Sequence, residues 1–449
     1  MPKYWKRSRI TKVLTDASRA GSFPEAEARL DAVHLNVIVG PDQIGTPAGQ
    51  AAVLTAVATA YKCFGRVTLV AGNDVPLIAP LPLGKTLLKA ARRLGAKITV
   101  QPSRAATHAI RIGAAPRSPG WDLHCWWDRW LSGTRAFEHD EIGDSRFAIS
   151  GVFSGAAAVR QVFACVLAGQ NIHARDVTVS LWTPWERADL AVKGPERFDV
   201  PDKLWLLGLG HLGQAFIWNL CFLGGNGERL AVLQDDQTIS EENEATSLLV
   251  LPGDGQIDLR KTRVAAPWLE ACGWQTELIE RRHHGDIAVT ANDPPYLLSG
   301  LDRLKPRLTL AQHGFSFMLD AGIGHGAGDF EGIQLRTLAK SQPLDGLWCD
   351  PGQSVVEDGT KGLLGRPAYL ELEQHVGRCG TVSFAEASVA VPFVGAAAGA
   401  LTISQAIRLA SLECAPLFLQ VELGAPEMAT FGGFTAAPET NLGSFSVQL

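Results

Sequence analysis

Apolar and polar positions in the second half of the chain follow the order of a strand, a tight turn and a helix. The apolar run 204–207 leads into Gly208, Gly210 and Gly213 and then into a helix-length apolar pattern, and a second apolar run covers 230–233. Glycines between a buried strand and a helix let backbone N–H groups at the helix start approach an anion. The pattern therefore predicts a Rossmann-like α/β domain with a phosphate-binding turn.

The first half repeats this pattern in a weaker form. Strands are expected at 33–39 and 67–70, with a helix-length apolar stretch between them. The tripeptide GQA at 49–51 stands where GQA at 213–215 stands, and FSGAAA around Gly155 matches FVGAAA around Gly395. We predict two Rossmann-like domains in tandem, over residues 1–198 and 199–449, with a polar linker at 193–201 between their cores.

The two copies differ where a nucleotide would bind. The turn of the first copy is lengthened to GPDQIG, and Gly72 and Asn73 stand where the second copy has Asp235 at the end of its second strand. An acid at that position can hold the hydroxyl groups of a nucleotide ribose. The first domain is therefore expected to be degenerate, and the second to bind the nucleotide.

The remaining segments complete the expected fold. Residues 1–30 are expected to form one or two short helices, 287–290 a strand ending at Asn292-Asp293, and 308–324 and 333–338 further strands. From about 339 to 378 the sequence shows no periodicity, and such a stretch inside a compact domain is normally functional or mobile. The uncharged run 387–407 is rich in Ala and Gly and contains Pro392, so a buried helix is expected there rather than a membrane span.

Charge and cysteine usage restrict the partners and the compartment. The net charge is −5 without a long run of one sign, which argues against nucleic acid or a membrane surface as partner. The eight cysteines occur singly, without a CxxC pair, so neither a structural zinc nor a disulfide scaffold is expected. The N-terminus lacks the apolar core of a signal peptide, and a cytoplasmic location is expected.

Groups that hold ATP against a carboxylate occur in order along the second half. The glycine turn supplies N–H donors through Gly208, Gly210 and Gly213. Asp235 is the acid after the second strand, Lys261 opens a helix, and Asp293 is the acid after a predicted strand. Asp293 would be a hard oxygen ligand for Mg²⁺. Alone, Asp293 fits a helix cap and Lys261 a surface residue, and the turn fits a dehydrogenase equally well. The ordered set favours nucleotidyl transfer from ATP.

From residue 204 to about 408 the chain resembles the ThiF/E1-like adenylating domain of ubiquitin-type activating enzymes and sulfur-carrier adenylyltransferases. The family pattern is GxGxxG, DxDxVxxSNLxRQ, a helix-opening Lys, a strand-end Asp and a Cys upstream of a small-residue helix. It falls on Gly208, Gly210 and Gly213, on DDQTI at 235–239 with Asn243, and on Lys261, Asp293 and Cys379. The resemblance implies that Gly208, Gly210, Asp235, Asn243 and Lys261 bind ATP and that Asp293 binds Mg²⁺.

The chain departs from this family pattern at two places. The second Asp is Gln237, and the Arg-Gln pair falls on TS at 246–247, so one expected phosphate-binding arginine is missing. Its candidates for replacement are Arg260, Arg263 or an arginine of the other half. In this family a partner subunit often lends an N-terminal arginine, and the segment YWKRSR offers Arg7 and Arg9.

A reactive thiol is the next expectation, because activating enzymes pass the acyl adenylate to a cysteine as a thioester. This step needs an accessible thiolate near positive charge. Cys379 has Arg378 beside it and is expected at the end of the aperiodic stretch, and Cys349 in the same stretch is the rival. Cysteines 63, 165 and 221 lie in apolar helical patterns and are expected to be inert core residues.

A degenerate copy fused to a working copy is similar to activating enzymes of the eukaryotic type. The size and the absence of zinc-binding cysteine pairs are most like the activating enzymes of bacterial ubiquitin-like antiphage conjugation operons. This resemblance implies ATP-dependent adenylation of a ubiquitin-like modifier, thioester formation on Cys379 and transfer to a separate E2-like conjugating enzyme. The alternatives are a sulfur-carrier type adenylyltransferase without the thioester step, an NAD-dependent oxidoreductase, and a non-catalytic scaffold. The expected assembly is a homodimer or a monomeric pseudo-dimer.

Overall fold

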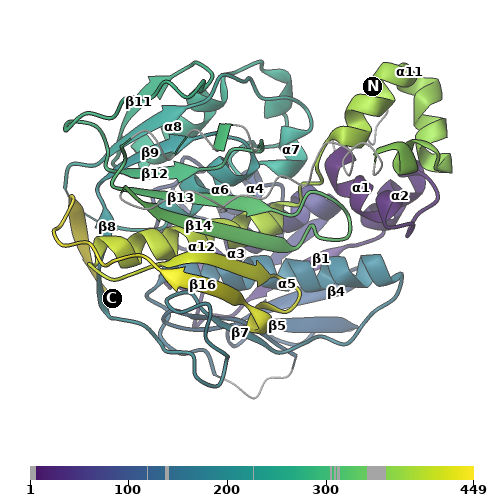
Figure 1. The fold of residues 1–449 in the computed structure, drawn as a ribbon. Coiled ribbons are helices and arrows are strands. Elements are labelled where there is room, and N and C mark those ends of the chain that lie inside the picture. Colours follow the sequence, from purple (N-terminus) through teal and green to yellow (C-terminus); the bar gives the residue numbers. More distant parts are fainter. Residues whose placement is uncertain are drawn as a thin grey trace.

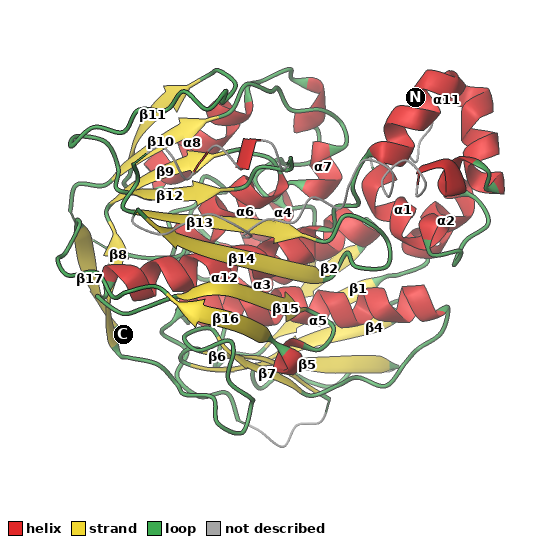
Figure 2. Cartoon of the chain, viewed as in Figure 1, coloured by secondary structure: helices red, strands yellow, loops and turns green. Residues whose placement is uncertain are grey.

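Two β-sheets form the framework of the protein, each built from one half of the chain (Figures 1 and 2). The computed structural model describes residues 7–118, 120–136, 141–225, 227–303, 306–307, 310, 314–340 and 360–449. The first half supplies a seven-stranded sheet and the second half an eight-stranded sheet. The predicted α/β fold with two Rossmann-like domains in tandem is therefore confirmed.

The first sheet has the strand order β3-β2-β1-β4-β5-β6-β7. Strands β1 to β5 pair in parallel, and β6 and β7 are antiparallel to their neighbours. The elements of this half are α1 (Ser8–Asp16), α2 (Phe23–Asp31), β1 (Leu35–Val39), α3 (Pro47–Phe64), β2 (Val67–Val70), α4 (Leu87–Arg93), β3 (Lys97–Thr99), β4 (His108–Ile112), β5 (Trp121–Asp128), β6 (Leu131–Arg135), α5 (Ala148–Ala168) and β7 (Val177–Ser180).

The second sheet has the order β11-β10-β9-β12-β13-β14-β15-β16, which repeats the arrangement of the first and supports the predicted internal repeat. Its strands β9 to β13 pair in parallel, and β14 to β16 are antiparallel. The elements of this half are β8 (Arg197–Pro201), β9 (Lys203–Leu207), α6 (His211–Leu220), β10 (Leu230–Gln234), α7 (Asn243–Thr246), α8 (Lys261–Ala271), β11 (Gln275–Ile279), β12 (Tyr296–Ser299), β13 (Phe317–Ile323), β14 (Gly332–Ala339), α11 (Pro367–Glu386), α12 (Pro392–Ala410), β15 (Pro416–Glu422), β16 (Thr430–Phe434) and β17 (Ser444–Gln448). Strands β8 and β17 form a separate two-stranded sheet.

Apolar helices of both halves pack on one another between the sheets, where α3, α5, α6 and α12 share one continuous core (Figure 1). Close approach requires small residues. A Cβ on Gly155 would lie 2.7 Å from the Ala52 oxygen, and one on Gly399 would lie 2.6 Å from the Ala215 oxygen. Small residues on α5 and α12 therefore let each of these helices lie close to the backbone of a neighbouring helix.

Helices α5 and α12 are long and apolar enough, by length and composition, to cross a membrane. In α5 78% of the most apolar window is buried inside the protein, and in α12 100%. Core helices of this kind meet the same criterion, and α12 accounts for the buried helix predicted at 387–407.

A helical lobe formed by α1, α2 and α11 projects from the rest of the protein (Figure 1, upper right). The buried Lys12 on α1 donates hydrogen bonds to the Phe384 and Ala385 oxygens, both at 3.0 Å, and thereby holds the end of α11. The helices predicted within 1–30 are confirmed. Helix α11 covers residues of the stretch in which no periodicity was seen.

Two local predictions were wrong. Residues 287–290 are irregular rather than a strand, because Ile287 and Val289 pack their side chains onto the face of the second sheet against Trp205. The predicted linker 193–201 contains β8, which pairs antiparallel with β17 near the C-terminus. Apolar side chains in both segments serve contacts that are distant in sequence.

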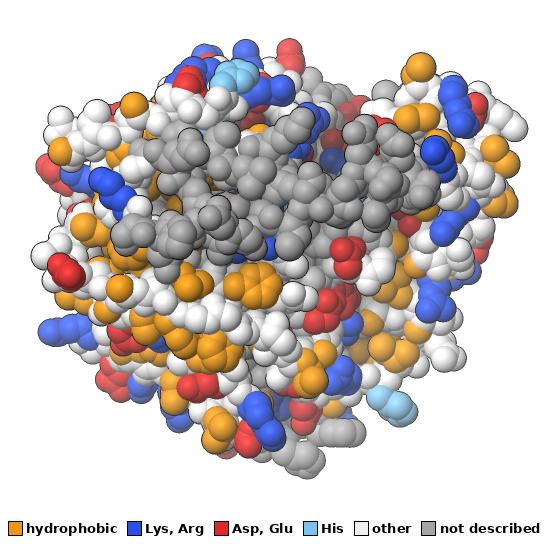
Figure 3. Space-filling model, viewed as in Figure 1, with side chains coloured by type: hydrophobic (Ala, Val, Ile, Leu, Met, Phe, Trp, Pro, Cys, Tyr) orange, Lys and Arg blue, Asp and Glu red, His pale blue; other side chains and the backbone are white. Residues whose placement is uncertain are grey.

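The surface shows no region of a single charge over the described part of the face in Figure 3. Basic, acidic and apolar side chains are interspersed there, including on the projecting lobe. This agrees with the nearly balanced charge of the chain.

Candidate functional site

The glycine turn joins β9 to α6 at the carboxyl edge of the second sheet. Gly208 has a φ of 81°, and a Cβ on Gly213 would lie 2.0 Å from the Gly208 oxygen, so both positions need glycine. Helix α6 has Gly210 as its N-cap and no side-chain hydrogen bond at the cap. Its first N–H groups therefore remain available to an anion.

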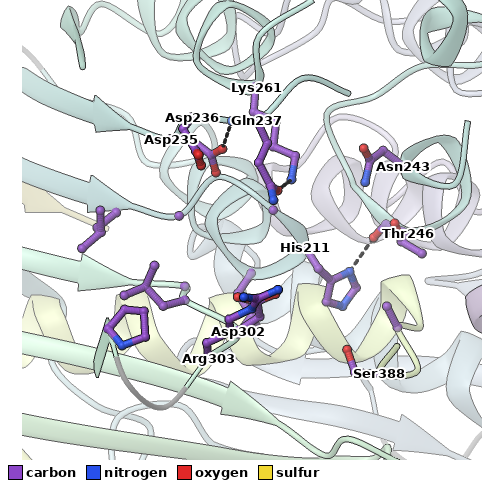
Figure 4. A pocket seen from close by; sticks show the side chains of 18 of the residues that line it. His211, Asp235, Asp236, Gln237, Asn243, Thr246, Lys261, Asp302, Arg303 and Ser388 are labelled. Atoms are coloured by element: carbon purple, nitrogen blue, oxygen red, sulfur yellow. Dashed lines mark hydrogen bonds between the residues drawn. The ribbon is translucent and has the colours of Figure 1, made fainter. Parts of the chain in front are cut away.

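A cavity of about 540 Å³ adjoins this turn (Figure 4). The volume lies within the range of small-molecule sites, roughly 300–1,000 Å³. Its cationic side chains are Arg9, Lys261, Arg281, Arg282, Arg303 and Arg307, and its acidic side chains are Asp235, Asp236, Glu242 and Asp302. The excess of cations suits a ligand with several negative charges.

Asp235 follows β10 and ties the glycine turn to this strand. Its Oδ2 accepts a hydrogen bond from Leu209 N at 2.7 Å, and its Oδ1 accepts one from Gln237 N at 2.8 Å. Each carboxylate oxygen has a further lone pair. The carboxylate is thus fixed at the cavity wall and can still accept from a ligand hydroxyl.

Lys261 opens helix α8 and reaches the turn. Its Nζ donates to Gln237 Oε1 at 2.6 Å, and a Cβ on Gly210 would lie 3.9 Å from Nζ. Gln237 stands where the family pattern has an acid, so the ammonium group meets a neutral acceptor and its charge is left for an anion.

Segment 243–246 forms another part of the wall. Asn243 lines the cavity, and its Oδ1 accepts from Ser240 N at 2.8 Å. His211 Nδ1 donates to the Thr246 oxygen at 2.5 Å, a contact marked in Figure 4. Burial, together with the nearby Arg9 and Lys62 charges, lowers the pKa of His211 to about 4, against the opposing effect of the Thr246 oxygen. The imidazole is therefore neutral at pH 7 and fixed to this wall.

Arg9 brings a cation from the first half into the cavity. Its Nη1 donates to the Ser388 oxygen at 2.6 Å, and its Nε donates to Glu242 at 3.3 Å. Arg7 instead pairs with Glu27 and donates to the Cys63 oxygen at 2.9 Å. Of the two N-terminal arginines, Arg9 is the one at the site.

Arg260 and Arg263, the other proposed replacements for the missing arginine, are not among the residues that line the cavity. Arg260 donates a hydrogen bond to the backbone oxygen of Asp236, and Arg263 forms an ion pair with Glu280 at 2.8 Å. Both guanidinium groups are directed toward neighbouring protein groups.

Asp293 does not line the cavity. Its Oδ2 accepts from Thr290 N and Thr290 Oγ1, both at 2.7 Å, in a turn that precedes β12. On the side of β9 opposite β10 lies β12, and the acid that follows β12 is Asp302, which lines the cavity beside Arg303 (Figure 4). The magnesium role of Asp293 stays a prediction, and Asp302 is the better placed carboxylate.

Cys379 is exposed in helix α11, shortly after a kink at Gly377. Of the other described cysteines, Cys414 is half-buried and the rest are buried, and burial raises the thiol pKa of Cys63 and Cys165. The rival Cys349 lies outside the described residues. Cys379 does not line the cavity, but the connection that follows its helix contributes residues 388–390 to the lining.

The equivalent turn of the first half is closed by its own side chains. Thr46 caps α3 by accepting from Gly49 N at 3.0 Å, and Pro47 occupies the first helical turn. Asp42, in this turn, accepts with its Oδ1 a hydrogen bond of 2.8 Å from Ala114 N, in the loop that follows β4. These contacts occupy donors that an anion would need, which supports the prediction of a degenerate first half.

The donor set fits a magnesium ion that is shared with a ligand. In the part of the chain that the structure describes, no group of three or more His, Cys, Asp and Glu side chains could hold a metal ion. Mg²⁺ commonly takes only one or two protein carboxylates and completes its shell with phosphates and water. Asp302 at a cation-rich cavity meets this requirement.

Several lining residues were missed by the sequence interpretation. Asp302 and Arg303 follow YLLSG, an apolar run that could have been read as the strand after β11. His211 lies inside the glycine motif itself. No sequence pattern marks Arg281 and Arg282 as site residues, because only the three-dimensional path of the chain after β11 brings them to the cavity.

Comparisons with known proteins agree with the two-part organisation. Models for the BilD N-terminal domain and the BilD C-terminal domain match residues 34–181 and 200–412. A bacterial E1-like protein BilD from Collimonas sp. (strain OK412) is 30% identical over 413 residues, covering 89% of this chain and 87% of the relative. The crystal structure of E. coli tRNA N6-threonylcarbamoyladenosine dehydratase, TcdA, matches at 12% identity and a TM-score of 0.29, covering 46% of this chain and 84% of that one. A structure described as TcdA (CsdL) matches at 13% identity and a TM-score of 0.30 with the same coverage.

Proposed function

Because this chain belongs to the BilD family of bacterial E1-like proteins, we propose that its second half adenylates the C-terminal carboxylate of a ubiquitin-like protein with ATP. The observation that carries the proposal is the cation-rich cavity at the uncapped start of α6. Every group that the sequence assigned to the nucleotide, except Gly213 behind the turn, lines this cavity.

The donors and acceptors at the cavity support the binding of ATP. The N–H groups at the start of α6 and the Lys261 ammonium group hold the phosphates, since both offer positive charge at the same side of the turn. The Asp235 carboxylate accepts hydrogen bonds from the ribose hydroxyls, and the Asn243 amide group donates to them. Gly208 and Gly210 let the phosphates approach the backbone.

Adenylation joins a carboxylate oxygen of the protein substrate to the α-phosphorus of ATP. The bond from that phosphorus to the bridging oxygen breaks, and pyrophosphate leaves with the bonding electrons. Arg9 and Lys261 stabilise the negative charge that develops, and fixed cations in a partly dry site are effective in this role. Bound Mg²⁺ neutralises phosphate charge, and Asp302 is the carboxylate proposed to hold it.

The next proposed step transfers the activated carboxyl group to Cys379. The thiolate attacks the carbonyl carbon of the adenylate, AMP leaves, and a thioester remains for an E2-like conjugating enzyme. The exposure of Cys379 and the short connection from its helix to residues 388–390 support this assignment. An adenylyltransferase of the sulfur-carrier type is the alternative, and it would not need Cys379.

A single chain suffices for this site, because the first half supplies Arg9. This favours a monomeric pseudo-dimer over a homodimer. The described cysteines are free thiols, which supports the proposed cytoplasmic location. We extend the proposal to a role in antiviral conjugation, which a phage plating assay with an Asp302→Asn strain would test.

The direct test is ATP–pyrophosphate exchange by the purified full chain with the ubiquitin-like protein encoded nearest to it. Exchange that depends on both this protein and Mg²⁺ is expected. Tight binding of NAD without any exchange would replace the proposal with the oxidoreductase alternative.

A further inference from the structure

Lys62 is a lysine of the first half whose side chain ends in the second half. It lies in the last turns of α3 and is buried against the segment that follows Asn243. Its Nζ donates hydrogen bonds to the backbone oxygen of Glu244 at 2.6 Å and to the backbone oxygen of Val250 at 2.7 Å. One ammonium group thus ties together two ends of the connection 244–250.

The tied connection forms part of the nucleotide cavity. Thr246 lines the cavity, and its oxygen accepts from His211 Nδ1 at 2.5 Å. Leu249 N donates to Gln214 Oε1 at 3.0 Å, which attaches the same connection to α6. The family pattern places its phosphate-binding arginine at this connection, where this chain has Thr246. The position of the wall therefore depends on contacts with its backbone.

We infer that Lys62 is a positioning residue for the nucleotide site: it holds the wall 244–250 against α6 by two hydrogen bonds across the boundary between the halves. The inference rests on the proposed function and adds to it a second task for the degenerate half, beside the supply of Arg9.

The chemistry of the amine suits this task. Two buried carbonyl groups would lose their partner without it, and each unpaired buried carbonyl destabilises its local backbone. Burial lowers the pKa of Lys62 to about 7, with the charges of Glu244 and Asp254 opposing the shift. A neutral amine still carries two N–H donors, so both hydrogen bonds persist in either protonation state.

A purely structural role would have other consequences. Breaking a contact between the halves elsewhere should lower stability without changing the affinity of the folded protein for nucleotide. Arg160 on α5 provides such a contact, because it pairs with Glu331 at 2.7 Å and neither residue lines the cavity. Arg160→Met is therefore the matched control for Lys62→Met.

The experiment measures binding of a non-hydrolysable ATP analogue with Mg²⁺ to the full chain, together with amide hydrogen exchange of residues 244–250. Lys62→Met is expected to weaken analogue binding about 10-fold and to speed exchange of these amides, whereas Arg160→Met changes neither. Lys62→Gln, which keeps an amide NH₂ donor group on a shorter side chain, is expected to give values between those of the wild type and Lys62→Met.

The outcomes separate the two proposals. Failure of the wild type to bind the analogue would refute the nucleotide site. Hydrogen exchange of 244–250 in the Lys62 variants would still test whether Lys62 holds this segment against α6. Binding by Lys62→Met as tight as wild type, with unchanged exchange, would refute the positioning role alone. If neither Lys62 variant folds, rapid hydrogen exchange of the backbone amides of residues 246 and 249 in the wild type would refute the positioning role of Lys62.

Discussion

Arg9 Nη1 donates a hydrogen bond of 2.6 Å to the backbone oxygen of Ser388. Arg9 belongs to the first half of the chain, and Ser388 lies in the connection between α11, which carries Cys379, and α12. Both residues line the cavity, so this contact joins the first half of the chain, at the cavity, to the connection that follows the helix of Cys379.

Removal of the Arg9 charge should impair adenylation more than it impairs folding. Arg9→Ala is expected to lower ATP–pyrophosphate exchange about 100-fold, the loss typical for one charge-stabilising donor. Arg29→Ala, which removes an exposed arginine paired with Glu25 on the neighbouring helix α2, should leave exchange unchanged. Equal exchange by Arg9→Ala and wild type would show that the cation is not used.

The two candidate magnesium ligands are separated by a pair of isosteric variants. Asp302→Asn is expected to raise the Mg²⁺ concentration needed for half-maximal exchange about 10- to 100-fold, because a neutral amide binds the ion weakly. Asp293→Asn should retain the wild-type requirement, since Asp293 only caps a turn through Thr290. The reverse order in a Mg²⁺ titration would return the role to Asp293.

The thioester step is tested at Cys379. Cys379→Ala is expected to keep pyrophosphate exchange and to lose the reductant-sensitive adduct with the ubiquitin-like protein, as seen by non-reducing electrophoresis. Cys414→Ala is the control, because Cys414 is half-buried and far along the chain from α11. Full formation of the adduct by Cys379→Ala would contradict the assignment of Cys379 and leave Cys349 as the candidate for the thioester.

His211 should make stability depend on pH in the acidic range. Its folded-state pKa of about 4 lies below the ordinary value of 6.5, so the unfolded state alone takes up a proton between these values. Stability therefore falls as pH drops from 6.5 to 4, by at most about 1.4 kcal/mol per pH unit from this group. His211→Asn, which keeps a donor for Thr246, should show a shallower decline in urea unfolding. Parallel curves for the two proteins would contradict a neutral buried His211.

Local patterns were sufficient for the parts of the site that are local in sequence. The turn at Gly208 and Gly210 was predictable because an apolar strand, a required positive φ and a following helix lie within a few residues. Asp235 was predictable for the same reason, as it directly ends β10. Lys261 was placed correctly at the start of α8.

The rest depended on contacts that the sequence does not display. The run around Ile287 is apolar because it covers the sheet, and an apolar run of that length looks the same as a strand. This mistaken strand made Asp293 the predicted strand-end acid in place of Asp302. Helix α11 was missed because its apolar residues, such as Tyr369 and Leu372, pack against a remote partner, the N-terminal helices.

The central claim, that one half of the protein holds Mg²⁺–ATP while the other half supports it, is tested most directly by calorimetry. Full-length protein is titrated with a non-hydrolysable ATP analogue in the presence of Mg²⁺, and separately with NAD. The account predicts one analogue bound per chain, lost in Asp302→Asn at low Mg²⁺, and no heat from NAD. Two analogues per chain, or binding of NAD in place of the analogue, would contradict it.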